Sequence, residues 1–106
     1  MNIKTTSVFE KSFTKLFKKD RQLLEEFEKL VYELKENSEL GTSLGNARYK
    51  IRVKNKSSNK GKSAGYRVVT YTKIEDTVVL VYIYSKSNEE SVSIHKIDEI
   101  ISNYKI

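Results

Sequence analysis

The chemistry open to this sequence rests on lysine, arginine and tyrosine, because other reactive residue types are scarce. Cysteine is absent and there is one histidine, which excludes disulfides and the Cys/His zinc patterns. No nucleophile elbow, Walker A sequence or dinucleotide-binding glycine pattern occurs. Nine cations and no carboxylate fall between residues 40 and 74, namely Arg48, Lys50, Arg52, Lys54, Lys56, Lys60, Lys62, Arg67 and Lys73. This segment carries +9, whereas the other eleven cations and fourteen acids sum to −3, so the basic character is local.

Clustered cations on a fixed surface suit the metal-independent cleavage of RNA. RNA carries its own nucleophile in the 2′-hydroxyl, so the protein must align that oxygen, move protons and neutralise the charge that builds on the phosphate. Arginine can donate in a fork to the non-bridging oxygens, and a lysine among other cations can act as a base. A metal-dependent nuclease would need paired carboxylates on the same strands, and the sequence from Arg48 to Lys73 has none. We therefore expect no metal or other cofactor.

A strand is the element expected to position these cations. Basic residues at positions 48, 50, 52 and 54 alternate with apolar residues at 49, 51 and 53, and a period of two is typical of a strand with one buried face. The cations would then project together as a fixed electropositive surface that attracts polyanions. Nucleic acid is the expected partner. A membrane surface is not expected, because no amphipathic basic helix accompanies the cations.

Three further strands and three helices complete the predicted elements. Helical spacing of apolar residues begins at Phe9, again after Asp20 as a cap, and again after Ser93 as a cap. Strands are predicted over residues 2–8, 48–54, 65–72 and 77–85, the last buried on both faces, with the final three in an antiparallel meander. Gly41 and Gly45 mark a connection expected to be irregular.

This order predicts an α+β fold in which helices cover one face of a small twisted antiparallel sheet and leave the other face for function. A chain of 106 residues is expected to form a single domain over residues 1–106. No apolar run approaches the roughly 20 residues that cross a bilayer, and the start of the chain lacks the apolar stretch of a secretory signal. We expect a cytoplasmic protein.

Three stretches of the sequence resemble the RelE/ParE superfamily of toxins. They are Tyr49-Lys-Ile-Arg-Val-Lys-Asn-Lys, Lys62-Ser-Ala-Gly-Tyr-Arg-Val-Val-Thr-Tyr and Val78-Val-Leu-Val-Tyr-Ile-Tyr-Ser-Lys86, with the Gly-Lys-Ser-x-Gly-x-Arg-Val pattern closest to the HigB-like branch. The resemblance implies a RelE-like fold with two N-terminal helices and the toxin component of a type II toxin–antitoxin system. In the mRNA-interferase branch such a toxin is an endoribonuclease that cuts mRNA on the ribosome. Its implied partners are mRNA, the ribosome and a DNA-binding cognate antitoxin.

The resemblance also implies roles for individual residues. Lys50 and Arg52 match the catalytic basic pair, Arg67 matches the transition-state arginine of the next strand, and Lys86 falls at or beside a further basic position. The place of the family's C-terminal Tyr or His is held by Val92 and Ser93. RNA contacts are expected from His95, two residues on, from Tyr84 as an alternative, and from lysines that grip phosphates without reading sequence, namely Lys54, Lys56, Lys60 and Lys62.

Two other functions stay open at this point. A toxin of the gyrase-inhibiting branch would share the fold but would not need RNA-cleaving cations. A non-enzymatic, basic RNA-binding module would repress translation by occupancy, and it would tolerate the charge-conserving change Arg67→Lys, whereas a forked arginine contact in catalysis would not.

Overall fold

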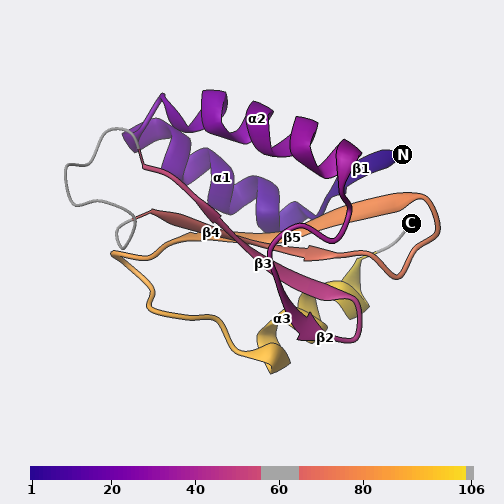
Figure 1. Cartoon of the computed structure of the whole chain (residues 1–106). Coiled ribbons are helices and arrows are strands. Elements are labelled where there is room, and N and C mark those ends of the chain that lie inside the picture. Colours follow the sequence, from indigo (N-terminus) through magenta and orange to yellow (C-terminus); the bar gives the residue numbers. More distant parts are fainter. Residues whose placement is uncertain (56–64, 105–106) are drawn as a thin grey trace.

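The structure is a computed structural model that describes residues 1–55 and 65–104. In chain order its elements are β1 (Asn2–Thr5), α1 (Ser7–Lys19), α2 (Leu23–Glu36), β2 (Thr42–Gly45), β3 (Arg48–Val53), β4 (Tyr66–Tyr71), β5 (Thr77–Ser85) and α3 (Ile94–Asn103). The strands form one sheet in the order β1-β5-β4-β3-β2. Figure 1 shows α1 and α2 together on one side of this sheet and α3 on the other. The predicted α+β fold is confirmed.

Two features of the predicted architecture need correction. The sheet is mixed rather than antiparallel, because β1 runs parallel to β5 while the β2-β3, β3-β4 and β4-β5 pairs are antiparallel. Helices cover both faces, because Ile97 and Ile100 of α3 pack on the side of the sheet that α1 and α2 leave open. The face expected to be free is therefore partly covered at its β5 side.

Side-chain hydrogen bonds lie next to the starts of α1 and α2, and both starts differ from the positions that the sequence predicts. The first strand stops at Thr5 rather than at residue 8, because the Thr6 hydroxyl accepts a hydrogen bond from the Phe9 N–H (3.0 Å) and so begins α1. Asp20 was expected to cap the second helix. It instead accepts from the Gln22 N–H (3.1 Å) and from the Tyr66 hydroxyl (2.8 Å), and α2 begins at Leu23.

The segment expected to be an irregular connection contains the short strand β2. Thr42 and Ser43 pair with Lys50 and Tyr49 of β3, and the two-residue turn that follows has positive φ at Asn46 (51°) and Ala47 (63°), as tight hairpins require. Gly41 precedes the strand at φ +97°, where a Cβ atom would lie 2.5 Å from the Lys50 carbonyl oxygen. The glycine therefore permits the close approach that starts the pairing.

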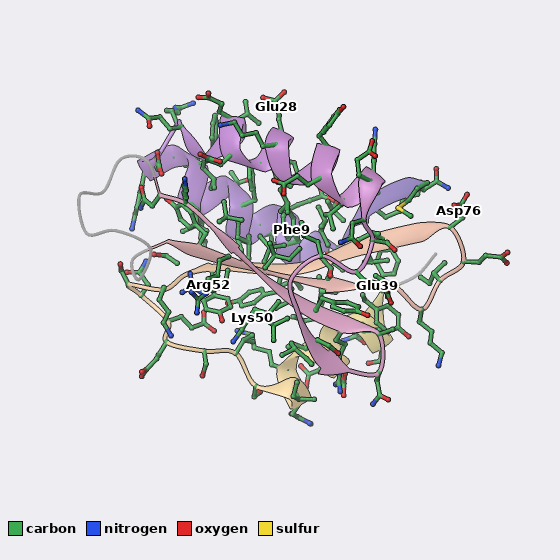
Figure 2. The ribbon with its side chains drawn as sticks, in the orientation of Figure 1. Phe9, Glu28, Glu39, Lys50, Arg52 and Asp76 are labelled. Atoms are coloured by element: carbon green, nitrogen blue, oxygen red, sulfur yellow. The ribbon has the colours of Figure 1, made fainter. Side chains whose placement is uncertain are left out.

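The larger core lies between the sheet and the pair α1 and α2. Phe9 is buried at its centre (Figure 2), and its ring lies 6.0 Å from that of Phe13 and 5.9 Å from that of Phe27. Phe9, Phe13 and Phe27 therefore pack in this core. The other members of this core are Leu23, Leu30, Leu34, Ile51, Val53, Tyr66, Val68, Val78, Leu80 and Ile83.

A bulge in β5 decides which face its tyrosines occupy. Val69 pairs with Tyr82 but Thr70 pairs with Leu80, so Val81 is an extra residue on β5. Leu80 and Ile83 consequently join the core under α1 and α2, whereas Val81, Tyr82 and Tyr84 all join the core on the α3 side. The bulge thus places both tyrosines on the face that carries the cations of β3 and β4.

Candidate active site

The predicted catalytic cations of β3 and β4 lie on one face of the sheet, opposite α1 and α2. Arg52 pairs with Arg67, and Arg67 pairs with Tyr84, so these three side chains form a row across β3, β4 and β5. Lys50 lies in the neighbouring row, opposite Val69. Figure 2 shows Lys50 and Arg52 both on the side of the sheet that faces away from α1 and α2. The fold therefore brings Lys50, Arg52 and Arg67 together.

Arg67 is a buried cation without a carboxylate partner. The residue is 6% exposed, and its Nη1 donates a hydrogen bond to the carbonyl oxygen of the adjacent Tyr66 (3.1 Å). Among residues 1–55 and 65–104 no acid forms an ion pair with it. Burial raises the pKa of the Tyr84 hydroxyl beside it, and the positive charge of Arg67 works against that rise. A buried, unpaired charge is costly, so this position is a candidate site for an anion.

Arg48 lies on the same face but is neutralised. Its Nη1 lies 2.8 Å from Asp98 Oδ1 of α3, and its Nε donates to the Gly45 carbonyl oxygen (2.9 Å). Arg48 is therefore a structural tie between β3, the β2–β3 hairpin and α3. The sequence from Arg48 to Lys73 has no acid, but the chain that follows β5 brings Asp98 and Glu89 to this face.

A second polar cluster on this face involves residues that the sequence analysis did not select. The Tyr82 hydroxyl donates to Glu89 Oε1 (2.9 Å), and Lys96 Nζ donates to the Tyr82 hydroxyl (3.1 Å) while lying 4.4 Å from the centre of the ring. Burial raises the pKa of Tyr82, and the hydrogen bond to Tyr82 raises the pKa of Lys96. At neutral pH the cluster holds a neutral phenol and a charged ammonium. The sequence gives only one sign of this cluster, which is that Tyr82 and Tyr84 are two residues apart on a predicted strand and so share a face.

The chain matches the model of the RelE toxin of the RelE/RelB toxin–antitoxin system over residues 3–103. The chain belongs to the RelE toxin family. No curated protein sequence matches it. Membership confirms the resemblance to RelE/ParE toxins and implies a cognate antitoxin as partner, while the HigB-like branch stays a prediction.

The other candidate residues of this RelE-family toxin, Lys86, Tyr84 and His95, differ in their surroundings. Lys86 follows β5, and its Nζ donates to the Glu90 carbonyl oxygen (2.7 Å). Tyr84 is 3% exposed and its ring centre lies 5.8 Å from that of Tyr82, so its ring presents no open face to a base. The His95 side chain is 90% exposed on α3.

The lysines expected to grip phosphates fall into two groups. Lys54 is exposed and directly follows β3. Lys56, Lys60 and Lys62 lie outside the residues that the structure describes. Within the described ranges of this RelE-family toxin, no three His, Asp or Glu side chains gather as metal ligands would. No helix there has the length and apolar character that a membrane span needs.

Proposed function

We propose that this RelE-family toxin is a ribosome-dependent endoribonuclease that cleaves mRNA without a metal ion, as in the HigB-like branch. The observation that carries the proposal is Arg67, which is buried, has no described acid as partner and lies in one row with Arg52. Preorganised cations aimed at developing charge are an effective means of stabilising a transition state, since they cost no reorganisation during the reaction. A substrate phosphate would be the negatively charged partner that no described acid provides for Arg67.

In the proposed reaction the 2′-oxygen attacks the adjacent phosphorus and the bond from phosphorus to the 5′-oxygen breaks. The products are a 2′,3′-cyclic phosphate and a 5′-hydroxyl. Arg67 and Arg52 hold the non-bridging oxygens, which gain charge during the step. Arginine does not release a proton in proteins, so we assign the two proton transfers to lysines of this group, Lys50 and Lys86.

The remaining residues have supporting roles in this proposal. Lys54 and the lysines at 56, 60 and 62 hold the RNA backbone through charge alone. His95 contacts RNA from the exposed surface of α3, where its side chain is 90% exposed. Tyr84 supports the guanidinium of Arg67 from the next strand instead of stacking on a base, because its ring is buried.

The test is incubation of the purified toxin with ribosomes programmed with a defined message, followed by mapping of the cut ends. We expect cuts within the codon at the ribosomal A site and none in the same message without ribosomes. Intact message in the presence of toxin that inhibits growth would refute the proposal. Inhibition of gyrase with intact message would identify the gyrase-inhibiting branch, and ribosome or message binding without cleavage would identify a non-enzymatic module.

A further inference from the structure

The β5–α3 segment, residues 86–93, connects two elements but belongs to neither a helix nor a strand. Figure 1 shows it leaving the end of β5 and running to α3 on the side of the sheet opposite α1 and α2. Its first part is a tight turn, because the N–H groups of Asn88 (3.0 Å) and Glu89 (2.9 Å) both donate to the Ser85 carbonyl oxygen. The segment therefore lies on the same side of the sheet as the cations of β3 and β4.

The position of the Lys86 ammonium depends on the shape of this segment. The Lys86 N–H donates to the Gly65 carbonyl oxygen (3.0 Å), which places its backbone beside the start of β4, two residues from Arg67. Its Nζ donates to the Glu90 carbonyl oxygen (2.7 Å). A lysine side chain otherwise has many rotamers open to it, so whatever holds the Glu90 carbonyl in place also holds Nζ.

The Tyr82 hydroxyl connects the β5–α3 segment to the sheet. It donates to Glu89 Oε1 (2.9 Å) and accepts from Lys96 Nζ (3.1 Å), so β5, the segment and α3 meet at one oxygen atom. Tyr82 is buried, and its ring centre lies 5.8 Å from that of Tyr84, so the hydroxyl has a fixed position. Val92 adds an apolar contact, because it packs against the core that contains both tyrosines. Among the described hydrogen bonds, only the one from Tyr82 to Glu89 joins a side chain of the segment to a strand.

We propose that Tyr82 is a positioning residue for mRNA cleavage, whose hydrogen bond to Glu89 holds the β5–α3 segment in the shape that orients the Lys86 ammonium. The inference rests on the proposed function, in which Lys86 takes part in proton transfer. Tyr82 does not itself carry the proton, since its hydroxyl is engaged by Glu89 on one side and by Lys96 on the other. A displacement of about 1 Å in a reacting group can slow a reaction by about 10²-fold.

The experiment compares two tyrosine-to-phenylalanine variants in the cleavage of ribosome-bound mRNA. Tyr82→Phe removes the hydroxyl and keeps the ring. Tyr49→Phe is the matched control, because the Tyr49 hydroxyl donates to another glutamate, Glu39 Oε2 (3.0 Å), and its side chain lies on the face of β3 opposite Lys50. We expect Tyr82→Phe to lower kcat by about tenfold or more while KM changes by less than about twofold. Tyr49→Phe should leave both constants unchanged, and thermal melting verifies that each variant is folded.

Two further comparisons separate positioning from a structural or a chemical role. Adding Tyr82→Phe to Lys86→Met should slow the residual cleavage no further, because the hydroxyl acts through the ammonium that is already lost. Glu89→Ala should lower kcat as Tyr82→Phe does, and Glu89→Gln, which restores an oxygen acceptor, should recover most of that loss. The inference is overturned if Tyr82→Phe slows both backgrounds by the same factor, or if Glu89→Gln is as slow as Glu89→Ala.

Amide hydrogen exchange measures the shape of the segment without any cleavage. Exchange at Asn88 and Glu89 should be faster in Tyr82→Phe than in the unmodified toxin and unchanged in Tyr49→Phe. Equal exchange in all three proteins, or an unchanged kcat in Tyr82→Phe, would overturn the inference. If the unmodified toxin cleaves no mRNA, the proposed function fails, and the exchange rates still decide whether Tyr82 holds the segment.

Discussion

Replacing Arg67 by lysine should lower the rate of mRNA cleavage by about 10²–10³-fold, the size typical of losing one preorganised donor to a transition-state oxyanion. The charge is retained, but lysine cannot reproduce the planar fork that contacts two oxygens at once. Arg67 has only the Tyr66 carbonyl as a described hydrogen-bond partner, so little structure depends on its guanidinium. The measurement is the single-turnover cleavage rate on programmed ribosomes, together with the melting temperature of the variant.

Arg21→Lys provides the matched control for this prediction. Arg21 is an exposed arginine whose guanidinium lies 4.7 Å from the centre of the Phe17 ring, at the turn between α1 and α2. The same chemical change there should leave the cleavage rate unaltered. If Arg67→Lys cleaves as fast as Arg21→Lys, the forked contact is dispensable and Arg67 has no catalytic role.

Arg48→Met should have the opposite profile, with reduced stability and a preserved catalytic face. The Arg48 side chain is 7% exposed and is tied to Asp98 and to the Gly45 carbonyl. Removing the guanidinium breaks the link between β3 and α3 and takes a hydrogen-bond partner from Asp98 and from the Gly45 carbonyl. We therefore expect the free energy of unfolding to fall by about 2 kcal/mol. This loss is smaller than the roughly 3–5 kcal/mol typical of breaking a fully buried pair, because the Asp98 side chain is 57% exposed and is solvated when released. Urea denaturation measures the change.

Lys50→Met is the control on the same strand and the same face. Lys50 is two residues from Arg48, and no described acid forms an ion pair with it. Its replacement should change the free energy of unfolding by less than about 0.5 kcal/mol and should slow cleavage. Equal destabilisation by Arg48→Met and Lys50→Met would contradict the division of this face into a structural and a catalytic cation.

The strands that carry the cations were predictable because their sequence pattern is local. Alternation at residues 48–54 predicted β3 and the common face of Lys50 and Arg52, and the apolar run at 77–85 predicted the bounds of β5. The same run conceals the bulge at Val81, because a strand buried on both faces shows no alternation that an extra residue could interrupt. β2 was missed because its four residues are mostly exposed and carry no periodic signal.

The environment of each cation could not be predicted from the sequence. Arg48 and Arg67 look alike in the chain, since both lie in acid-free strands. Asp98, fifty positions further along, neutralises Arg48 and not Arg67, and only the packing of α3 on the sheet decides this. The hydrogen bonds of Tyr82 with Glu89 and Lys96 depend in the same way on how the chain after β5 folds back.

The most direct test of the central claim is to replace the 2′-hydroxyl of the nucleotide at the cut by hydrogen in a ribosome-bound message. The cations Lys50, Arg52 and Arg67 supply no nucleophile of their own in our proposal, so the deoxy-substituted link should stay intact. The unmodified message should yield a 2′,3′-cyclic phosphate and a 5′-hydroxyl. Cleavage of the deoxy-substituted link at the unmodified rate, or products with a 5′-phosphate, would contradict it.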